Sequence, residues 1–275
     1  MNELLKIEWL KVKNYRAFIV IGIFFLIGIV GSNYMVFAIK KYFIDKKDPT
    51  KIIASVSPYN FDNVWQTTSY VSGNLLLLLS LLMIMLVTNE FSFRTHRQNI
   101  IDGWSRKQFI EVKMFMAVLF ALLASLVVFF TGLGFGLTSG TTPSLRHFES
   151  IGYFFLKAVS YNMIALLMAV LVRKSGFAIG LFMVYMWLEN FVSTLLEALS
   201  YKLKASYKFD WGNLGDYLPM NASDGLLHFP KNPVTDLVKD ATTPADFMKV
   251  GLGAALLYLV LFFYWSNNRM LKTDL

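Results

Sequence analysis

The stretch GNLLLLLSLLMIMLVTNEFSFRTHRQNIIDGWSRKQFIEVKMFMAVLFALLASLVVFF, residues 73–130, sets a polar segment between two long apolar runs. The polar part, residues 88–113, carries three arginines and two lysines. A membrane-spanning helix needs about 20 mostly apolar residues, and each flanking run approaches that length. The stretch therefore predicts two spanning helices joined by a structured polar loop.

The composition of the whole chain is that of an integral membrane protein. Of its 275 residues, 56% are hydrophobic and 16% are charged, whereas soluble domains carry about 25% charged residues. The chain has no cysteine, which excludes disulfides and cysteine-based metal or redox sites. Its net charge of +8 fits basic residues at the membrane boundaries. We therefore expect a lipid bilayer around this chain and no nucleic-acid partner.

Six apolar runs are long enough to span a membrane. They are Phe18–Ile39, Tyr70–Thr88, Met114–Thr138, Tyr153–Val172, Phe177–Leu199 and Met248–Trp265. Backbone groups in lipid must be satisfied within their own element, and these runs do not alternate like barrel strands. The sequence predicts an all-α polytopic protein with a single transmembrane domain over residues 1–275. Residues 200–247 form the longest polar segment, which we expect outside the membrane, packed as short helices or caps.

Six spans place both termini on one side of the membrane. The total of lysine and arginine is equal on the two sides, but arginine gathers on the side of the termini. The tight turn VRKSG, residues 172–176, also favours that side as cytoplasmic. We therefore predict a plasma-membrane protein, in a bacterium the inner membrane, with both termini in the cytoplasm.

The first residues, MNELLKIEWLKVKNYRAF, are basic and lead directly into the first apolar run. Leu5, Trp9 and Val12 share a helix face. One interpretation is an interfacial helix anchored by Trp9, with its lysines reaching the headgroups. An ordinary basic flank explains the same residues equally well.

Two capping patterns divide the polar loop. Thr95 with Gln98, and Ser105 with Gln108, each fit a capping box, and Gly103 between them is a typical helix stop. The pattern predicts a short helix over residues 96–101 and a new helix from Arg106 that becomes the third span. Apolar Ile100, Ile101 and Trp104 stand among these charges, which favours docking on a partner over burial in the headgroup layer.

Residues 89–113 resemble the loop between spans two and three of ABC transporter permeases of the type-2 exporter class. Members commonly show a glutamate at the end of span two, a threonine-centred short helix, a small-residue turn before Ser-Arg, and a lysine entering span three. The matching positions here are Glu90, Thr95, Gly103, Ser105, Arg106 and Lys113. Trp104 stands where proline is usual, and the segments LVRKSGFAIG and YLPMNA are also similar to the family.

This resemblance implies the membrane-spanning permease subunit of an exporter. The loop would be a coupling helix that sits in a cleft of a separate cytoplasmic ABC ATPase subunit, with two permease chains, as a homodimer or with a similar paralogue, in the working unit. ATP and Mg²⁺ would bind the ATPase, since this chain has no G-x-x-x-x-G-K-[ST] loop. We expect a transport subunit rather than an enzyme, without a cofactor, metal or catalytic residue of its own. The implied coupling residues are Glu90, Thr95, Arg97, Gln98, Asn99, Asp102, Gly103, Trp104, Ser105 and Arg106.

A second candidate site lies inside the membrane. Glu189 is the one carboxylate deep within a predicted span, and Asn162 on the preceding span lies at a similar depth. Ionisable groups in the membrane mark functional sites or structural contacts between spans, and both interpretations stay open. Glu189 also gives the main alternative function, a stand-alone secondary transporter that uses it as proton or ion carrier. A membrane-embedded enzyme is the weakest interpretation, because no catalytic arrangement recurs at one depth.

Overall fold

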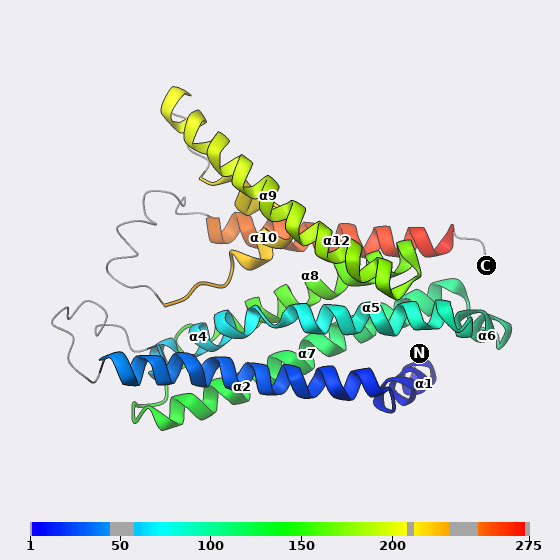
Figure 1. Cartoon of the computed structure of the whole chain (residues 1–275), viewed down its shortest axis with the longest axis horizontal. Helices are drawn as coiled ribbons and strands as arrows, with labels where there is room; N and C mark the ends of the chain where they lie inside the picture. The colour runs from blue at the N-terminus through cyan, green and yellow to red at the C-terminus, as the bar shows by residue number, and fades with distance from the viewer. Residues whose placement is uncertain (1, 45–57, 208–211, 231–246, 273–275) are drawn as a thin grey trace.

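The computed structural model describes residues 2–44, 58–207, 212–230 and 247–272, and every regular element in them is a helix (Figure 1). The elements are α1 (Asn2–Lys13), α2 (Arg16–Ile44), α4 (Phe61–Gly73), α5 (Leu76–Ser92), α6 (Thr95–Ile101), α7 (Arg106–Thr138), α8 (Glu149–Val172), α9 (Ser175–Tyr207), the 3-10 helix η1 (Leu214–Tyr217), α10 (Pro219–Asp224) and α12 (Phe247–Leu271).

Five of these helices are long and apolar enough to cross a membrane, and the bent pair α4–α5 gives a sixth crossing if it forms one span. The five are α2, α7, α8, α9 and α12, and each contains one of the predicted runs. The centre of the bundle is α8, whose most apolar window is 78% buried, against 11% for α9 and 17% for α2 and α12. Helices α4, α5, α7, α9 and α12 pack around α8.

The second span differs from the prediction of one helix over Tyr70–Thr88. Helices α4 and α5 meet at an angle of 47°, and α4 begins at Phe61, nine residues before the predicted run. Trp65 and Thr68, which lie before that run, are buried at 2% and 0% exposure. The prediction missed this part because its threonines, serine and glutamine lower the hydropathy, although they face protein rather than lipid.

Glycines on α7 let α4 approach closely. A Cβ atom on Gly136 would lie 2.8 Å from the Phe61 ring, and one on Gly132 would lie 3.0 Å from the Thr68 hydroxyl. Small residues at such positions let helices pack tightly where lipid gives no hydrophobic drive. The glycine-rich end of α7 is thus the surface on which the first half of the broken span rests.

Part of the predicted external segment folds back onto the bundle. α9 continues to Tyr207, and η1 and α10 pack against α8, α9 and α12. The expectation of short packed helices is confirmed for residues 212–224, whereas residues 208–211 and 231–246 lie outside the described part of the chain.

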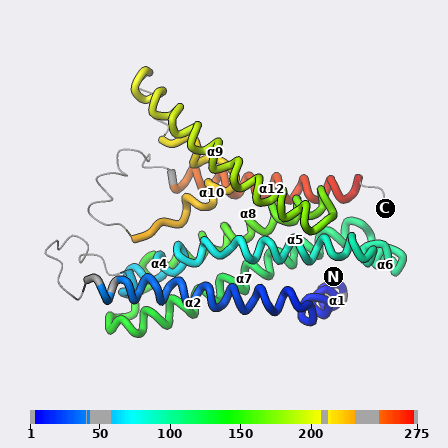
Figure 2. Tube along the Cα trace, in the orientation of Figure 1, coloured from blue at the N-terminus to red at the C-terminus, as the bar shows by residue number. Residues whose placement is uncertain are grey.

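One end of the bundle gathers α1, α6 and the end of α12, so the first and last described residues lie at the same end (Figures 1 and 2). This arrangement agrees with an even number of crossings. Which side of the membrane this end faces stays a prediction.

Candidate functional site

The short helix α6 lies at this end of the bundle, between α5 and α7 (Figure 1). It ends in a Schellman motif: the backbone N–H of Trp104 donates to the Asn99 carbonyl at 3.0 Å, and that of Gly103 donates to the Ile100 carbonyl at 3.1 Å. Gly103 takes a φ of +100°, a backbone conformation that residues with a Cβ atom rarely adopt. The predicted glycine stop is confirmed.

The start of α6 differs from the predicted capping box. Its N-cap is Arg94, in the left-handed conformation at φ 56°, and no side chain caps the helix. The Thr95 hydroxyl instead donates to the Glu90 carbonyl at 3.4 Å. The predicted box failed because α5 and α6 join through a tight turn, in which Thr95 is already the first helical residue.

The second predicted capping box is confirmed at the start of α7. The Gln108 backbone N–H donates to the Ser105 hydroxyl at 3.1 Å, and the Ser105 N–H donates to the Gln108 side chain at 2.9 Å. Arg106, the first residue of α7, also donates to the Leu271 carbonyl at 3.3 Å. The entry to the third span is therefore fixed locally and tied to the end of α12.

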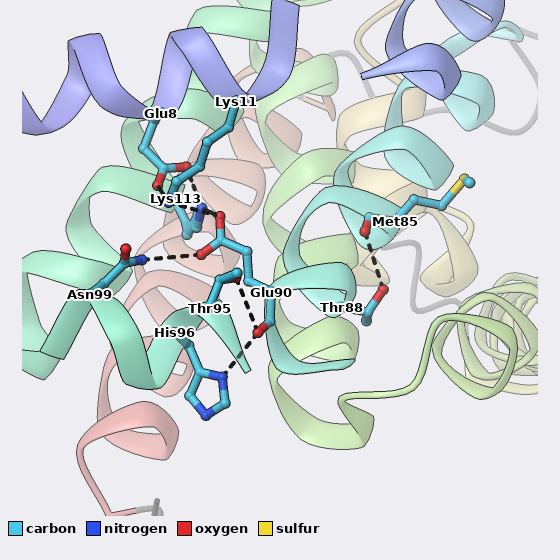
Figure 3. A network of polar contacts seen from close by, with 9 residues as sticks. All are labelled: Glu8, Lys11, Met85, Thr88, Glu90, Thr95, His96, Asn99 and Lys113. Atoms are coloured by element: carbon cyan, nitrogen blue, oxygen red, sulfur yellow. Dashed lines mark hydrogen bonds and ion pairs between the residues drawn. The ribbon is translucent and has the colours of Figure 1, made fainter. Parts of the chain in front are cut away.

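A buried cluster of charges joins α1, α5 and α7 beside α6 (Figure 3). The Lys113 ammonium, two turns inside α7, contacts the carboxylates of both Glu8 and Glu90. Lys11 lies 2.8 Å from Glu8 and 3.6 Å from Glu90, so two positive and two negative charges balance. Lys113 is 3% exposed, Glu8 2% and Glu90 8%. Removing one member would leave a buried charge without its partner.

The same glutamate holds the base of α6. The Glu90 carbonyl faces the His96 ring nitrogen at 3.0 Å, and its carboxylate accepts from the Asn99 side-chain amide at 3.5 Å (Figure 3). Asn99 and His96 are both buried. Glu90 thus links α6 to Lys113, and through Lys113 to α1.

Two opposing effects set the ionisation of Glu8. Burial alone would raise the pKa of its carboxyl, but the ammonium groups of Lys113 and Lys11 hold the pKa below its ordinary value of 4.5. Glu8 is therefore ionised at neutral pH. No local sequence pattern indicated this contact, because Glu8 and Lys113 are 105 residues apart.

The structure divides the predicted coupling residues into an exposed and a buried group. The exposed group is Thr95, Arg97, Gln98, Asp102, Gly103 and Ser105; Trp104 and Arg106 are half-buried; Glu90 and Asn99 are buried. Trp104 packs against the core, and the Lys11 ammonium lies 5.6 Å above its ring. Asn99, predicted as a contact residue, donates to the Glu90 carboxylate. Phe93 and Ile101, at 76% and 78% exposure, are the apolar side chains that this surface presents.

The second candidate site does not bring its two predicted residues together. The Glu189 carboxylate accepts from the backbone N–H groups of Met220 at 2.6 Å and Asn221 at 3.0 Å, so it holds the start of α10. The Asn162 amide instead donates to the Ala117 carbonyl on α7 at 3.0 Å. Asn162 therefore joins α8 to α7, and Glu189 joins α9 to α10.

A polar cavity of about 200 Å³ lies beside Glu189, at the break between α4 and α5. Gly73, Asn74, Lys157 and Asp224 are among the residues that line it. Lys157 lies 3.2 Å from Asp224, which also accepts from the Tyr161 hydroxyl. The sequence did not predict this pair, because Asp224 lies outside the apolar runs.

Among the described residues, no group of three or more histidine or acidic side chains could hold a metal ion. The chain matches no model of a known protein family and no curated protein. The case for a function therefore rests on these two sites alone.

Proposed function

We propose that the chain is the membrane-spanning permease subunit of an ATP-driven exporter, moved through α6 by a separate ATPase. The observation that carries the proposal is α6 itself, a short helix between two spans whose outer face is exposed and whose base is buried. A seven-residue helix is too short to be stable alone. Because α6 has a defined end at Gly103 and is anchored on Glu90, a partner that binds its exposed face would move it as a unit.

The charge cluster supports the same proposal. A movement of α6 passes to Glu90 through Asn99 and His96, and from Glu90 to Lys113 on α7 and Glu8 on α1. Buried ion pairs resist separation because each parted charge stays desolvated. An ATPase that moved α6 would therefore move the ends of three helices together, as a rigid-body transition requires.

The exposed side chains of α6 give the cleanest test. We expect Arg97→Glu and Ile101→Ser to abolish ATP-dependent transport and to weaken binding of the ATPase, while the chain stays folded, since both side chains are exposed. Trp104 is a poorer probe because it also packs against the core. The measurement is co-purification of the chain with candidate P-loop ATPases from the same genome, together with the ATP hydrolysis of the complex in nanodiscs.

Lys202→Gln, on the exposed outer part of α9, is the matched control and should leave both readouts unchanged. Normal ATPase binding and normal ATP hydrolysis with both α6 variants would show that α6 is not the coupling surface. Transport that continues without ATP would reject the exporter function altogether.

The cavity beside Glu189 favours one second candidate, a secondary transporter. Backbone breaks at membrane depth are tolerated where they line a protein-enclosed or water-filled cavity, and transporters bind substrates at such breaks. Against it, Glu189 is already engaged by two backbone N–H groups, and the described residues contain a single broken pair rather than two. Transport driven by a proton or sodium gradient in ATP-free vesicles, and lost in Glu189→Gln, would favour this function over the exporter.

A further inference from the structure

Helix α1 lies at the level where α2 enters the membrane. The Trp9 ring packs edge-on against Phe18, with ring centroids 6.2 Å apart, and Phe18 belongs to the first turn of α2. Phe18 in turn stacks on Phe120 of α7. Tryptophan concentrates at membrane–water interfaces. Trp9 therefore lies against the first turn of a helix that is long and apolar enough to span a membrane.

The charges of α1 are divided between its two faces. Glu8 and Val12 point inward, with 2% and 3% exposure. At 3.6 residues per turn, Lys6, Leu10 and Lys13 lie on the opposite face, and all three are exposed. Because Glu8 is buried against Lys113, the exposed charged side chains described in α1 are all lysines.

At the whole of this end of the bundle, most of the described cations are exposed, whereas most of the described carboxylates are buried or half-buried. The exposed cations of this end are Lys6, Lys11, Lys13, Arg16, Arg94, Arg97, Lys107, Lys174, Arg269 and Lys272. Against them, Asp102 is the one fully exposed acidic residue described at this end, since Glu90 and Glu8 are buried and Glu111 is half-buried. The buried cluster removes two carboxylates from the surface and leaves a positive rim.

We propose that the outward face of α1 binds the phosphate groups of anionic phospholipids. Lys6 and Lys13 supply the charge, and Ile7, Trp9 and Leu10 supply apolar side chains that are 42%, 39% and 47% exposed. A helix of this kind binds the bilayer surface through burial of its apolar side chains and through attraction of its lysines to anionic headgroups. An acidic protein would also match the lysines, but Trp9 lies against the start of a candidate span, where lipid headgroups are the expected neighbour.

The proposal is independent of the ATPase and is tested on the full chain alone. The chain is purified in mild detergent with equal amounts of phosphatidylglycerol and phosphatidylcholine, and the retained lipids are counted by native mass spectrometry. The wild type should retain phosphatidylglycerol in excess. Lys6→Gln with Lys13→Gln should reduce that excess by roughly fivefold for each charge removed, and higher salt should reduce it in the wild type.

Two matched variants complete the experiment. Arg146→Gln with Lys202→Gln removes two exposed charges from the other parts of the chain and should leave the excess unchanged. Lys6→Arg with Lys13→Arg keeps the charge and should also leave it unchanged. Equal retention of the two lipids by the wild type, or an excess that survives the glutamine changes, overturns the proposal; in the second case the other cations of the rim hold the lipid.

Discussion

Both ends of this molecule bury carboxylates, but they satisfy them in different ways. At the α6 end, Glu8 and Glu90 share the Lys113 ammonium, so side chains from three helices depend on one cation. At the other end, Glu189 accepts from the backbone of α10, and Asp224 pairs with Lys157 while keeping 38% of its side chain exposed. The first arrangement ties long helices to one another, and the second attaches the short helix α10 to the bundle. A charge change should therefore be felt globally at the first end and locally at the second.

The largest effect should come from Lys113→Met, which leaves two carboxylates buried with only the half-exposed Lys11 nearby. Breaking a buried ion pair costs about 3–5 kcal/mol, so we expect a large fall in the thermal midpoint in detergent, measured by size-exclusion chromatography of heated samples. Lys107→Met removes an exposed lysine 3.7 Å from Glu111 and should change the midpoint little.

The triple variant Glu8→Gln, Glu90→Gln, Lys113→Met tests the cause. It removes the buried charges together and should recover most of the lost stability, because neutral replacements of a whole ion cluster are often tolerated. If the triple variant is less stable than Lys113→Met alone, charge balance is not what the cluster supplies.

Glu189→Ala should have the next largest effect, confined to η1 and α10. It leaves the N–H groups of Met220 and Asn221 without their acceptor, at about 1–3 kcal/mol for each group that stays buried. Hydrogen exchange of residues 214–224 should rise while that of α7 stays unchanged. Glu189→Gln keeps one acceptor oxygen and should raise the exchange of these residues less. The exposed Glu197→Ala should leave it unchanged. Faster exchange throughout the bundle would contradict the local role.

The same substitution at two glycines should act through different causes. A Cβ on Gly215 would lie 2.6 Å from the Ser193 backbone carbonyl oxygen, so Gly215→Ala must push η1 away from α9, at about 1–3 kcal/mol. Gly103 has open space around it but a φ of +100°, so Gly103→Ala should cost about 1–2 kcal/mol through the backbone conformation. Midpoints of the two variants give the comparison, and Gly134→Ala, which meets open space at an ordinary φ, is the control.

The smallest effect should be the pH dependence of Glu8. Because its pKa in the folded chain lies below the ordinary 4.5, ionised Glu8 stabilises the fold above that pH. This contribution should fade as the pH falls through 4.5 toward the lower folded value. Glu8→Gln should therefore melt below the wild type at pH 7, with the gap closing at lower pH. A constant gap down to pH 3.5 would show that Glu8 does not act through its charge.

Local patterns were enough for some features and misleading for others. Ser105, Gln108 and Gly103 act on neighbours within five residues, so the sequence predicted the start of α7 and the end of α6. Thr95 matched the same kind of pattern but does not cap a helix. The turn at Arg94, which no sequence pattern indicates, moves the helix start by one residue. Thr95 is then the first helical residue and not the N-cap.

The candidate sites depended on partners that no local pattern names. Glu189 was recognisable from its depth in an apolar run. Its role as an acceptor depends on Met220, which is 31 positions away and becomes its neighbour only in the folded chain. Lys113 was recognisable as a polar residue at the start of a span. That the Glu8 side chain points from α1 toward Lys113 was not recognisable. Phe93 also escaped notice, because exposure depends on how α5 meets α6.

The sequence by itself determined that the chain is helical, lies in a membrane and carries a polar helix between two apolar spans. These features follow from composition and from contacts within one helical turn, which any window of the chain contains. Only the tertiary structure decided that α4 and α5 meet at a bend, that Glu8, Glu90 and Lys113 form one cluster, and that Glu189 holds α10. Each of these requires residues far apart in the chain to become neighbours, and it is packing around α8 that brings them together.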